Sequence, residues 1–235
     1  MPADAPEPWF RTFRESGDIL ITHVDLTPDA RREARAFSWL DAGERARWRR
    51  YRHDRPRREF ALCRAALRSL LCGRLGCANA RLAFGASELG KPFGLVDGLA
   101  APVSFSVSHG GGHGLVALAP RGRLGVDVED RAARVDIDGV GETVFGPGER
   151  AEFAAARGEE KRRMFFTLWT LKEALIKALG TGFSLNPARF EIPPAMRRGA
   201  REGAFRFPHV PNVRWRLENL GNADFAAALA HERGR

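Results

Sequence analysis

Short segments in which apolar and polar residues alternate occur in both halves of the chain, and this alternation is typical of half-buried β-strands. In the first half the pattern predicts strands over 18–26, 81–84, 103–108, 114–119 and 124–129. In the second half it predicts strand-like pieces over 183–192, 204–210, 213–217 and 225–229. Glycine-rich turns separate several of these segments, most clearly at 110–112. We therefore expect much of the chain to form sheets of short strands.

Apolar residues at intervals of three and four predict a helix over 57–75. Its buried stripe consists of Phe60, Cys63, Leu67, Leu70 and Leu71. Gly76 is expected to end this helix, because glycine readily adopts the left-handed conformation found there. Arg58, Arg64 and Arg68 lie largely off the stripe.

Further helices are expected over 149–156 and over 160–179, the second ending at Gly180. Another helical region opens after Thr27-Pro28-Asp29 and continues into the arginine-rich segment 31–53, whose apolar face is broken. Helices followed by strands thus occur twice along the chain. This order predicts an α+β fold that is pseudo-duplicated, although no clear sequence repeat accompanies it. The predicted halves are 1–121 and 122–235, joined near 120–124.

The composition is that of a globular protein: 235 residues, of which 44% are hydrophobic and 29% charged. No apolar run reaches the length of about 18 residues that is needed to cross a bilayer. The first ten residues contain three prolines and no apolar core, which argues against a secretory signal. Cys63, Cys72 and Cys77 are odd in number and lack metal-binding spacing, so we expect reduced thiols and a cytoplasmic protein.

The net charge of +9 is compatible with nucleic acid, an anionic membrane or an acidic protein as the partner. Arginine supplies most of this charge, and only four of the 38 basic residues are lysines. The single tyrosine and the lack of zinc-finger spacing argue against a nucleic-acid-binding module. We expect neither nucleic acid nor membrane as a partner.

Two carboxylates stand two residues apart in Gly125-Val126-Asp127-Val128-Glu129. Side chains at this spacing point to the same face of a strand, so Asp127 and Glu129 lie together while the valines face the core. Paired oxygen ligands suit a hard cation such as Mg²⁺. A half-buried strand with a solvated acidic face would give the same pattern.

The segment 169–177 reads WTLKEALIK. In a helix, residues four apart share a face, which brings Trp169, Glu173 and Lys177 to one side. An ordinary surface pair of Glu173 with Lys177 beside a core tryptophan would have the same spacing.

Ser108 is the last residue of the predicted strand 103–108, and His109 follows it directly before the three glycines. These glycines would let the backbone approach an anion closely. His113 lies four residues after His109, but the intervening glycines make a helical His–His zinc site improbable. Gly90-Lys91-Pro92 forms a turn, and the arginines of 45–58 form a helix face that solvent alone could explain.

Taken together, GKP at 90–92, FSVSH at 105–109, GVDVE at 125–129 and WTLKEALIK at 169–177 resemble the 4′-phosphopantetheinyl transferases. The resemblance is to the monomeric, pseudo-dimeric type that activates surfactin synthetase, and it covers about 40–185. It implies two subdomains, each a helix-flanked, mainly antiparallel sheet. The first would contact the nucleotide of coenzyme A, and the second would hold magnesium and the pyrophosphate.

The resemblance also implies roles for individual residues. Asp127, Glu129 and Glu173 would hold Mg²⁺ together with the pyrophosphate, which Lys177 would contact. Further coenzyme A contacts would come from Arg47, Arg58, Lys91, Pro92, Ser108, His109 and Asp127. Glu173 would accept the proton of the attacking serine, which makes Glu173 and Lys177 the expected catalytic residues.

The implied reaction moves the phosphopantetheine arm of coenzyme A to a serine of an acidic acyl or peptidyl carrier protein, releasing 3′,5′-ADP. An alternative is another magnesium-dependent enzyme that transfers or hydrolyses phosphate, because Asp127 and Glu129 would serve there as well. The motifs around Lys91, His109 and Lys177 would then be coincidental. The resemblance implies a monomer, and which carrier protein is served stays open.

Overall fold

The structure is a computed structural model that describes residues 9–182 and 185–233. The strands are β1 (Phe10–Ser16), β2 (Ile19–Asp25), β3 (Leu82–Ala86), β4 (Pro92–Val96), β5 (Leu99–Ala100), β6 (Ser104–Gly110), β7 (His113–Ala119), β8 (Leu124–Asp130), β9 (Glu202–Phe207), β10 (Val210–Asn219) and β11 (Phe225–Glu232). The helices are α1 (Ala30–Trp39), α2 (Ala42–Arg50), α3 (Asp54–Leu75), α4 (Ile137–Val144), α5 (Pro147–Ala155), α6 (Gly158–Leu179) and α7 (Pro194–Arg197).

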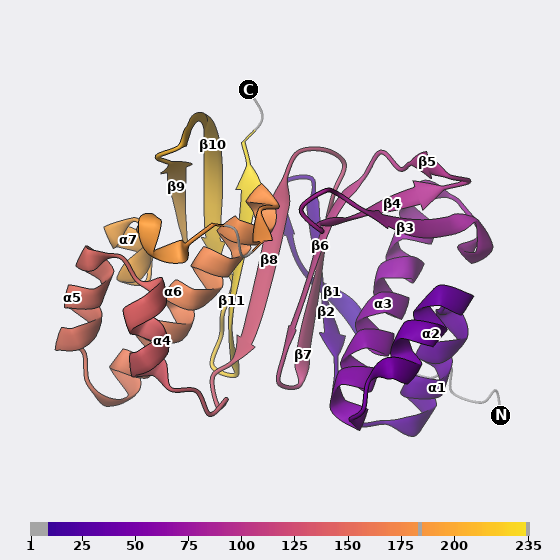
Figure 1. Cartoon of the computed structure of the whole chain (residues 1–235), viewed down its shortest axis with the longest axis horizontal. Coiled ribbons are helices and arrows are strands. Elements are labelled where there is room, and N and C mark those ends of the chain that lie inside the picture. Colours follow the sequence, from indigo (N-terminus) through magenta and orange to yellow (C-terminus); the bar gives the residue numbers. More distant parts are fainter. Residues whose placement is uncertain (1–8, 183–184, 234–235) are drawn as a thin grey trace.

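Two four-stranded antiparallel sheets form the centre of the protein (Figure 1). The first has the order β1-β2-β7-β6 and the second the order β8-β11-β10-β9. A small sheet, β3-β4-β5, flanks the first. The helix α3 covers the first sheet and α6 covers the second, so helices lie on both outer sides (Figure 1). The α+β class and the helix-flanked antiparallel sheets agree with the sequence prediction.

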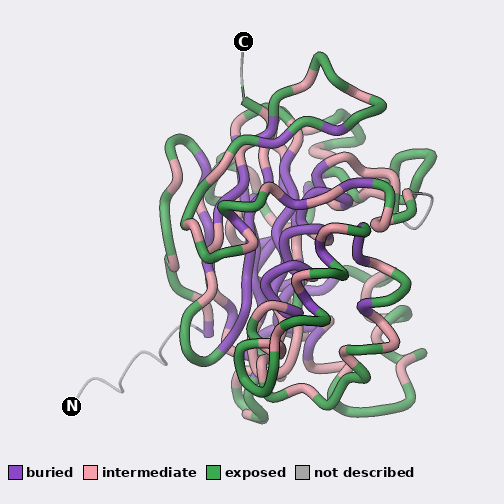
Figure 2. The backbone as a smooth tube through the Cα atoms, turned by 90° about the vertical axis from the view of Figure 1, so that its left-hand side faces the viewer, coloured by how far each residue is buried: buried purple, intermediate pink, exposed green. Residues whose placement is uncertain are grey.

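Three apolar clusters hold these layers together. One packs α3 against the first sheet, and another packs α6 against the second. The third lies between the sheets, where Ile21 and Leu115 meet Val126, Val128 and Leu229. Figure 2 shows the buried residues along the central strands and the exposed residues on the outer turns. Burial between the sheets therefore fixes which face of β8 remains for α6.

The two long helices end as predicted, because Gly76 and Gly180 both adopt left-handed backbone angles with φ of 61° and 82°. Arg68 lies off the predicted apolar stripe, and its side chain is nevertheless fully buried. Its guanidinium group donates to Asp41 and Glu44 at 2.5 and 2.7 Å. Burial is tolerated because these acids and nearby carbonyl groups satisfy the charge.

The five strands predicted in the first half are confirmed as β2, β3, β6, β7 and β8. The strand-like piece over 183–192 is wrong for 185–192, which contain the short 3₁₀ turn Pro187–Arg189, and 183–184 lie outside the described residues. Alternation alone misled there, because no neighbouring strand pairs with this segment. Strands before residue 120 form the first sheet and the small sheet β3-β4-β5, and β8 to β11 form the second sheet. The predicted division between residues 121 and 122 lies in the connection from β7 to β8, and it stays a prediction.

Among the described helices, none combines the length and the apolar character needed to cross a membrane. The three cysteines are free thiols. Cys63 is buried, and burial raises the pKa of its thiol to about 12. This thiol therefore contributes to packing as a small apolar group.

Candidate active site

Three residues of β8 face the helix α6, and we call Gly125, Asp127 and Glu129 the β8 row. A Cβ atom on Gly125 would lie 2.1 Å from the carbonyl oxygen of Ala174 and 2.4 Å from the amide nitrogen of Ala178. Glycine is therefore required at this position for α6 to pack directly on the strand. This close packing brings the α6 side chains to the two acids of the row.

A compact polar network joins β8, α6 and β6. Lys177 Nζ lies 2.6 Å from Asp127 Oδ1 and donates to Ser108 Oγ at 2.8 Å. Ser108 Oγ in turn donates to Asp127 Oδ1 at 2.7 Å. One turn before Glu173 on α6, the indole N–H of Trp169 donates to Glu129 Oε1 at 3.1 Å. The structure thus brings together the residues that two separate motifs predicted for one site.

The three acids repel one another in a partly desolvated place. Burial, followed by the charge of Asp127, raises the pKa of Glu129 to about 7. Burial and the charge of Asp127 also raise the pKa of Glu173, against the opposing charge of Lys177. Asp127 Oδ2 is buried and has no hydrogen-bond partner within the described part of the chain. A cation bound at this cluster would reduce the repulsion between the carboxylates.

The donor chemistry of this cluster fits a hard cation, since carboxylate oxygens are the preferred ligands of Mg²⁺. Asp127 Oδ2 supplies a buried oxygen without a partner. As the side chains lie, however, residues 9–182 and 185–233 contain no group of three His, Cys, Asp or Glu side chains arranged around a metal. Lys177 and Trp169 occupy other oxygens of Asp127 and Glu129, so metal binding would require these side chains to readjust.

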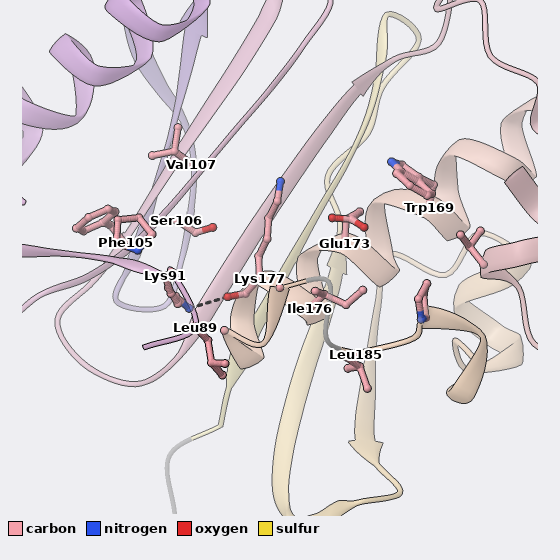
Figure 3. A pocket seen from close by; sticks show the side chains of 16 residues that line it. Leu89, Lys91, Phe105, Ser106, Val107, Trp169, Glu173, Ile176, Lys177 and Leu185 are labelled. Atoms are coloured by element: carbon pink, nitrogen blue, oxygen red, sulfur yellow. Dashed lines mark hydrogen bonds between the residues drawn. The ribbon is translucent and has the colours of Figure 1, made fainter. Parts of the chain in front are cut away.

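A cavity of about 500 Å³ opens beside this network (Figure 3). Trp169, Glu173 and Lys177 of α6 line one wall, and Ser106 and Val107 of β6 line the facing wall. The turn 89–92 closes the end near the last residues of α6. The lining is mostly apolar around these few charged groups, as in sites that bind a small organic molecule.

Lys91 lies at that end of the cavity but its ammonium group is engaged. Lys91 Nζ donates to the carbonyl oxygens of Leu124, Lys177 and Ala178 at 2.9, 2.7 and 3.2 Å (Figure 3 shows the bond to Lys177). Burial, with a smaller effect of the charge of Arg123, lowers the pKa of Lys91 to about 8. The three carbonyl groups favour the charged form and oppose this shift. Lys91 therefore fastens the end of α6 to the first half, and Pro92 follows at the start of β4.

The glycines after His109 form the β6–β7 turn and lie against the end of β8. A Cβ atom on Gly110 would lie 2.7 Å from the carbonyl oxygen of Val128, and one on Gly111 would lie 2.4 Å from Asp130 Cβ. These glycines therefore let the turn pack directly on β8, and their expected approach to an anion stays a prediction. His113 forms its contact with His23, at 3.0 Å between Nδ1 and Nε2, rather than with His109.

His109 faces the start of α3. His109 Nδ1 lies 3.5 Å from Glu59 Oε2, and Glu59 also accepts a hydrogen bond from Arg55 Nε at 2.7 Å. Burial lowers the pKa of His109, and the charge of Glu59 opposes this shift. The charges of Asp130 and Glu129 act on Arg55, which therefore lies toward the acidic end of β8. Sequence reasoning missed Arg55, although its i, i+4 spacing from Glu59 was a usable signal.

The two arginines predicted to contact coenzyme A lie outside the polar network. Arg47 is exposed, and its guanidinium carbon lies 5.0 Å from the centre of the Phe60 ring. Arg58 Nε donates to the carbonyl oxygen of Leu26 at 2.8 Å. Neither arginine contacts the acids, so any phosphate that they bind would belong to a distant part of the ligand.

Comparison with protein families and with curated proteins gives one consistent result. A model of the 4′-phosphopantetheinyl transferase superfamily matches residues 123–230, which include the β8 row and α6. A Synechocystis protein named as a 4′-phosphopantetheinyl transferase is 35% identical over 62% of this chain, and this chain spans 58% of that protein. A 4′-phosphopantetheinyl transferase of Nostoc is 31% identical, with 66% of this chain and 70% of that protein covered. One from Bacillus subtilis is 27% identical, with 74% and 75% covered.

Proposed function

The chain belongs to the 4′-phosphopantetheinyl transferase superfamily, and from this premise we propose that it moves the 4′-phosphopantetheine arm of coenzyme A to a serine of an acyl or peptidyl carrier protein. The observation that supports this proposal best is the meeting of the β8 row with Glu173 and Lys177 beside a cavity of about 500 Å³. Acids, a lysine and an apolar cavity suit a ligand with a diphosphate and an organic arm.

Asp127, Glu129 and Glu173 would hold Mg²⁺ at the diphosphate. The ion would supply positive charge that offsets the charge of the diphosphate and of the leaving group. Lys177 would bind the diphosphate as a compact point charge. Asp127 and Ser108 hold the Lys177 ammonium group at the edge of the cavity, which restricts where the phosphate oxygens can lie.

In the proposed reaction, the serine oxygen of the carrier protein bonds to the β-phosphorus of coenzyme A. The bond from that phosphorus to the bridging oxygen of the diphosphate breaks, and 3′,5′-ADP leaves with the electron pair. Glu173 accepts the serine proton, directly or through water. Its raised pKa suits this role, because a base that ionises nearer neutral pH holds a transferred proton more readily.

The nucleotide end would contact the first half. Its proposed partners are Arg47, Arg58, Lys91, Pro92, Ser108 and His109. Lys91 would have to exchange a backbone carbonyl for a phosphate oxygen, or else act by positioning the end of α6. His109 and the nearby Arg55 offer a histidine and an exposed cation for the terminal phosphate.

We further propose a cytoplasmic monomer that meets acidic carrier proteins. A net charge of +9 would steer an acidic partner over distances of about 10 Å at moderate ionic strength. The KM for the carrier protein should therefore rise with salt while kcat changes little. A KM independent of salt would contradict this steering.

Mass spectrometry of apo carrier proteins incubated with the enzyme, coenzyme A and Mg²⁺ tests the proposed function. We expect the mass of one phosphopantetheine arm on a serine and release of 3′,5′-ADP only when carrier protein is present. Release of nucleotide without a carrier would instead favour the alternative, a magnesium-dependent phosphate hydrolase. A Glu173→Gln variant that binds coenzyme A and Mg²⁺ yet keeps its full turnover would exclude Glu173 as the base.

A further inference from the structure

Another cavity, which is polar and has a volume of about 440 Å³, lies at the first turns of α6. Arg131, Arg162 and Arg163 line it together with Glu159 and the turn around Asn222. The wall thus carries three cations against one carboxylate. The ion pairs formed by the described residues do not include any of these three arginines, whereas the neighbouring lysine of α6 is paired. We call this cavity the arginine pocket.

The arginines of the pocket divide into one that holds the wall and two that remain available. Arg162 Nε donates to the carbonyl oxygen of Arg131 at 2.7 Å, and its Nη2 donates to that of Ala133 at 2.5 Å. Arg162 therefore ties the chain after β8 to α6. Arg163 is exposed, and its side chain forms no hydrogen bond with the described residues.

Arg131 is held in place with an unused donor. Its Nε donates to the carbonyl oxygen of Asn222 at 3.1 Å, while its Nη1 is shielded from solvent without a hydrogen-bond partner in the described ranges. Burial, and next the charge of Arg163, lowers the pKa of Arg131. Asn222 Oδ1 accepts from the amides of Asp224 and Phe225, which leaves its side-chain NH₂ as a donor. A shielded cation with a free N–H is suited to an oxyanion.

The arginine pocket and the candidate active site lie along the same helix, α6, and are lined by different residues. Arg131 follows Glu129 by two residues, in the turn after β8, so the two residues lie within about 7 Å along the chain. On α6, positions 162, 166, 169, 173 and 177 are three or four residues apart and share one side of the helix. From Arg162 to Glu173 the rise is about 16 Å. Lys91, by contrast, contacts the opposite end of α6.

We propose that Arg131 and Arg163, with the side-chain amide of Asn222, form an oxyanion pocket that binds a carboxylate of the carrier protein. The carrier serine must reach the acids, and an acidic side chain about 16 Å away on the same protein, measured along α6, would reach the pocket. A bidentate carboxylate matches the geometry of guanidinium donors. This proposal rests on the proposed transferase function.

Steady-state kinetics of the double variant Arg131→Gln/Arg163→Gln tests the pocket. We expect the KM for the carrier protein to rise about tenfold, the loss expected for one charge-assisted contact, with kcat and the KM for coenzyme A close to those of the unmodified enzyme. Arg198→Gln, at an exposed arginine at the end of α7, removes one positive charge, half of what the double variant removes. It shows how far net charge alone changes the KM, and any such effect is doubled for the comparison. Equal KM values for the double variant and the unmodified enzyme would overturn the proposal.

A double-mutant cycle then identifies the carboxylate. Each acidic residue of the carrier protein is changed to its amide, and the change that raises KM with the unmodified enzyme but not with the double variant marks the partner. A carrier scan in which every effect is the same for both enzymes would contradict a specific contact.

Binding of inorganic phosphate provides a readout that does not depend on transfer. Phosphate should raise the unfolding temperature of the unmodified protein and of Arg198→Gln more than that of the double variant, because a bound ligand stabilises the folded state. If phosphate shows this difference but the KM for the carrier protein does not change, the pocket binds an oxyanion. The proposal that the carrier protein supplies that oxyanion would then be overturned. Failure of the proposed function would look different: no carrier would be modified, and equal phosphate effects would then overturn the pocket as well.

Discussion

The helices α3 and α6 are the counterparts of each other in the two halves, and they differ in how closely they approach their sheets. Each has 22 residues, ends at a left-handed glycine and packs over a strand glycine. A Cβ atom on Gly114 of β7 would lie 2.8 Å from the Cys63 side chain of α3, whereas one on Gly125 of β8 would lie 2.1 Å from the α6 backbone. The closer approach in the second half is what brings Glu173 and Lys177 to the β8 row.

The buried cations of the two helices differ as well. Arg68 of α3 is neutralised by Asp41 and Glu44, and the Asp41 side chain remains 45% exposed. Lys172 of α6 is paired with Glu149, a side chain with no exposure at all. The same helix-on-sheet unit therefore serves as a scaffold with a half-open ion pair in the first half. In the second half a sealed pair fixes the helix that carries the candidate catalytic groups.

The largest effect is expected from removing the charge at the centre of the second half. Asp127→Asn should lower kcat about a thousandfold, because this carboxylate holds Lys177 and is a proposed magnesium ligand. The rate of arm transfer to a carrier protein measures this loss. Glu160→Gln, an exposed change on α6, is the control and should leave the rate unchanged. Near-normal turnover of Asp127→Asn would remove the acids from the mechanism.

The two buried cations should differ in their contribution to stability. Lys172→Met leaves Glu149 buried and unpaired, which should cost about 3–4 kcal/mol of unfolding free energy. Arg68→Met leaves Asp41, whose side chain is 45% exposed and can reach water, and Glu44, which is 11% exposed but keeps Arg64 at 3.5 Å. A cost of about 2 kcal/mol is expected. Urea denaturation of both variants measures the difference. Equal losses would show that enclosure of the acid does not set the cost.

Methyl groups added beneath the two helices compare the packing directly. Gly125→Ala would force α6 away from β8 and should cost about 3 kcal/mol together with most of the transfer activity. Gly114→Ala meets side chains rather than backbone, chiefly the Cys63 thiol at 2.8 Å and Val24 Cβ at 3.2 Å, and should cost about 1 kcal/mol with activity retained. Thermal unfolding and transfer rates of both variants provide the test. Retained activity in Gly125→Ala would disprove the need for direct helix–strand contact.

The smallest effect concerns the pH dependence of stability without metal. Between the ordinary pKa of 4.5 and its raised pKa of about 7, Glu129 binds a proton in the folded protein but not in the unfolded chain. Stability from this group is therefore present at low pH and is lost as the pH rises through about 7. Glu129→Gln should raise the unfolding temperature by a few degrees at pH 8 in a chelator, and by nothing below pH 4.5. A difference that is constant with pH would contradict the shift.

Strand and helix periodicity predicted which side chains of β8 and α6 share a face, because both elements bury the opposite face. The chemistry of those side chains was implied by the resemblance to the family. Lys172 and Lys177 belong to the same motif, yet one is sealed in the core and the other faces the acids. That difference depends on Glu149, which lies on α5 and in no recognised motif. Spacing within a helix cannot show which distant element will cover it.

The features that the sequence did not show have the same cause. The burial of Arg68 depends on Asp41 and Glu44 at the start of α2, and 185–192 was read as strand because the lack of a pairing strand is not visible in its own residues. Arg131 lies just past the end of β8, where the alternating pattern no longer predicts which way a side chain points. Local patterns thus predicted which side chains share a face of a helix or strand. Which of those side chains are buried depends on residues far away in the sequence.

The central claim is that β8 and α6 hold one cation and one diphosphate between them. Anomalous X-ray scattering from crystals grown with Mn²⁺ and coenzyme A tests it directly. We predict a single metal peak about 2.2 Å from carboxylate oxygens of Asp127, Glu129 and Glu173, with a diphosphate oxygen also bound. A peak away from these three side chains, or coenzyme A bound without metal at this site, would contradict the account.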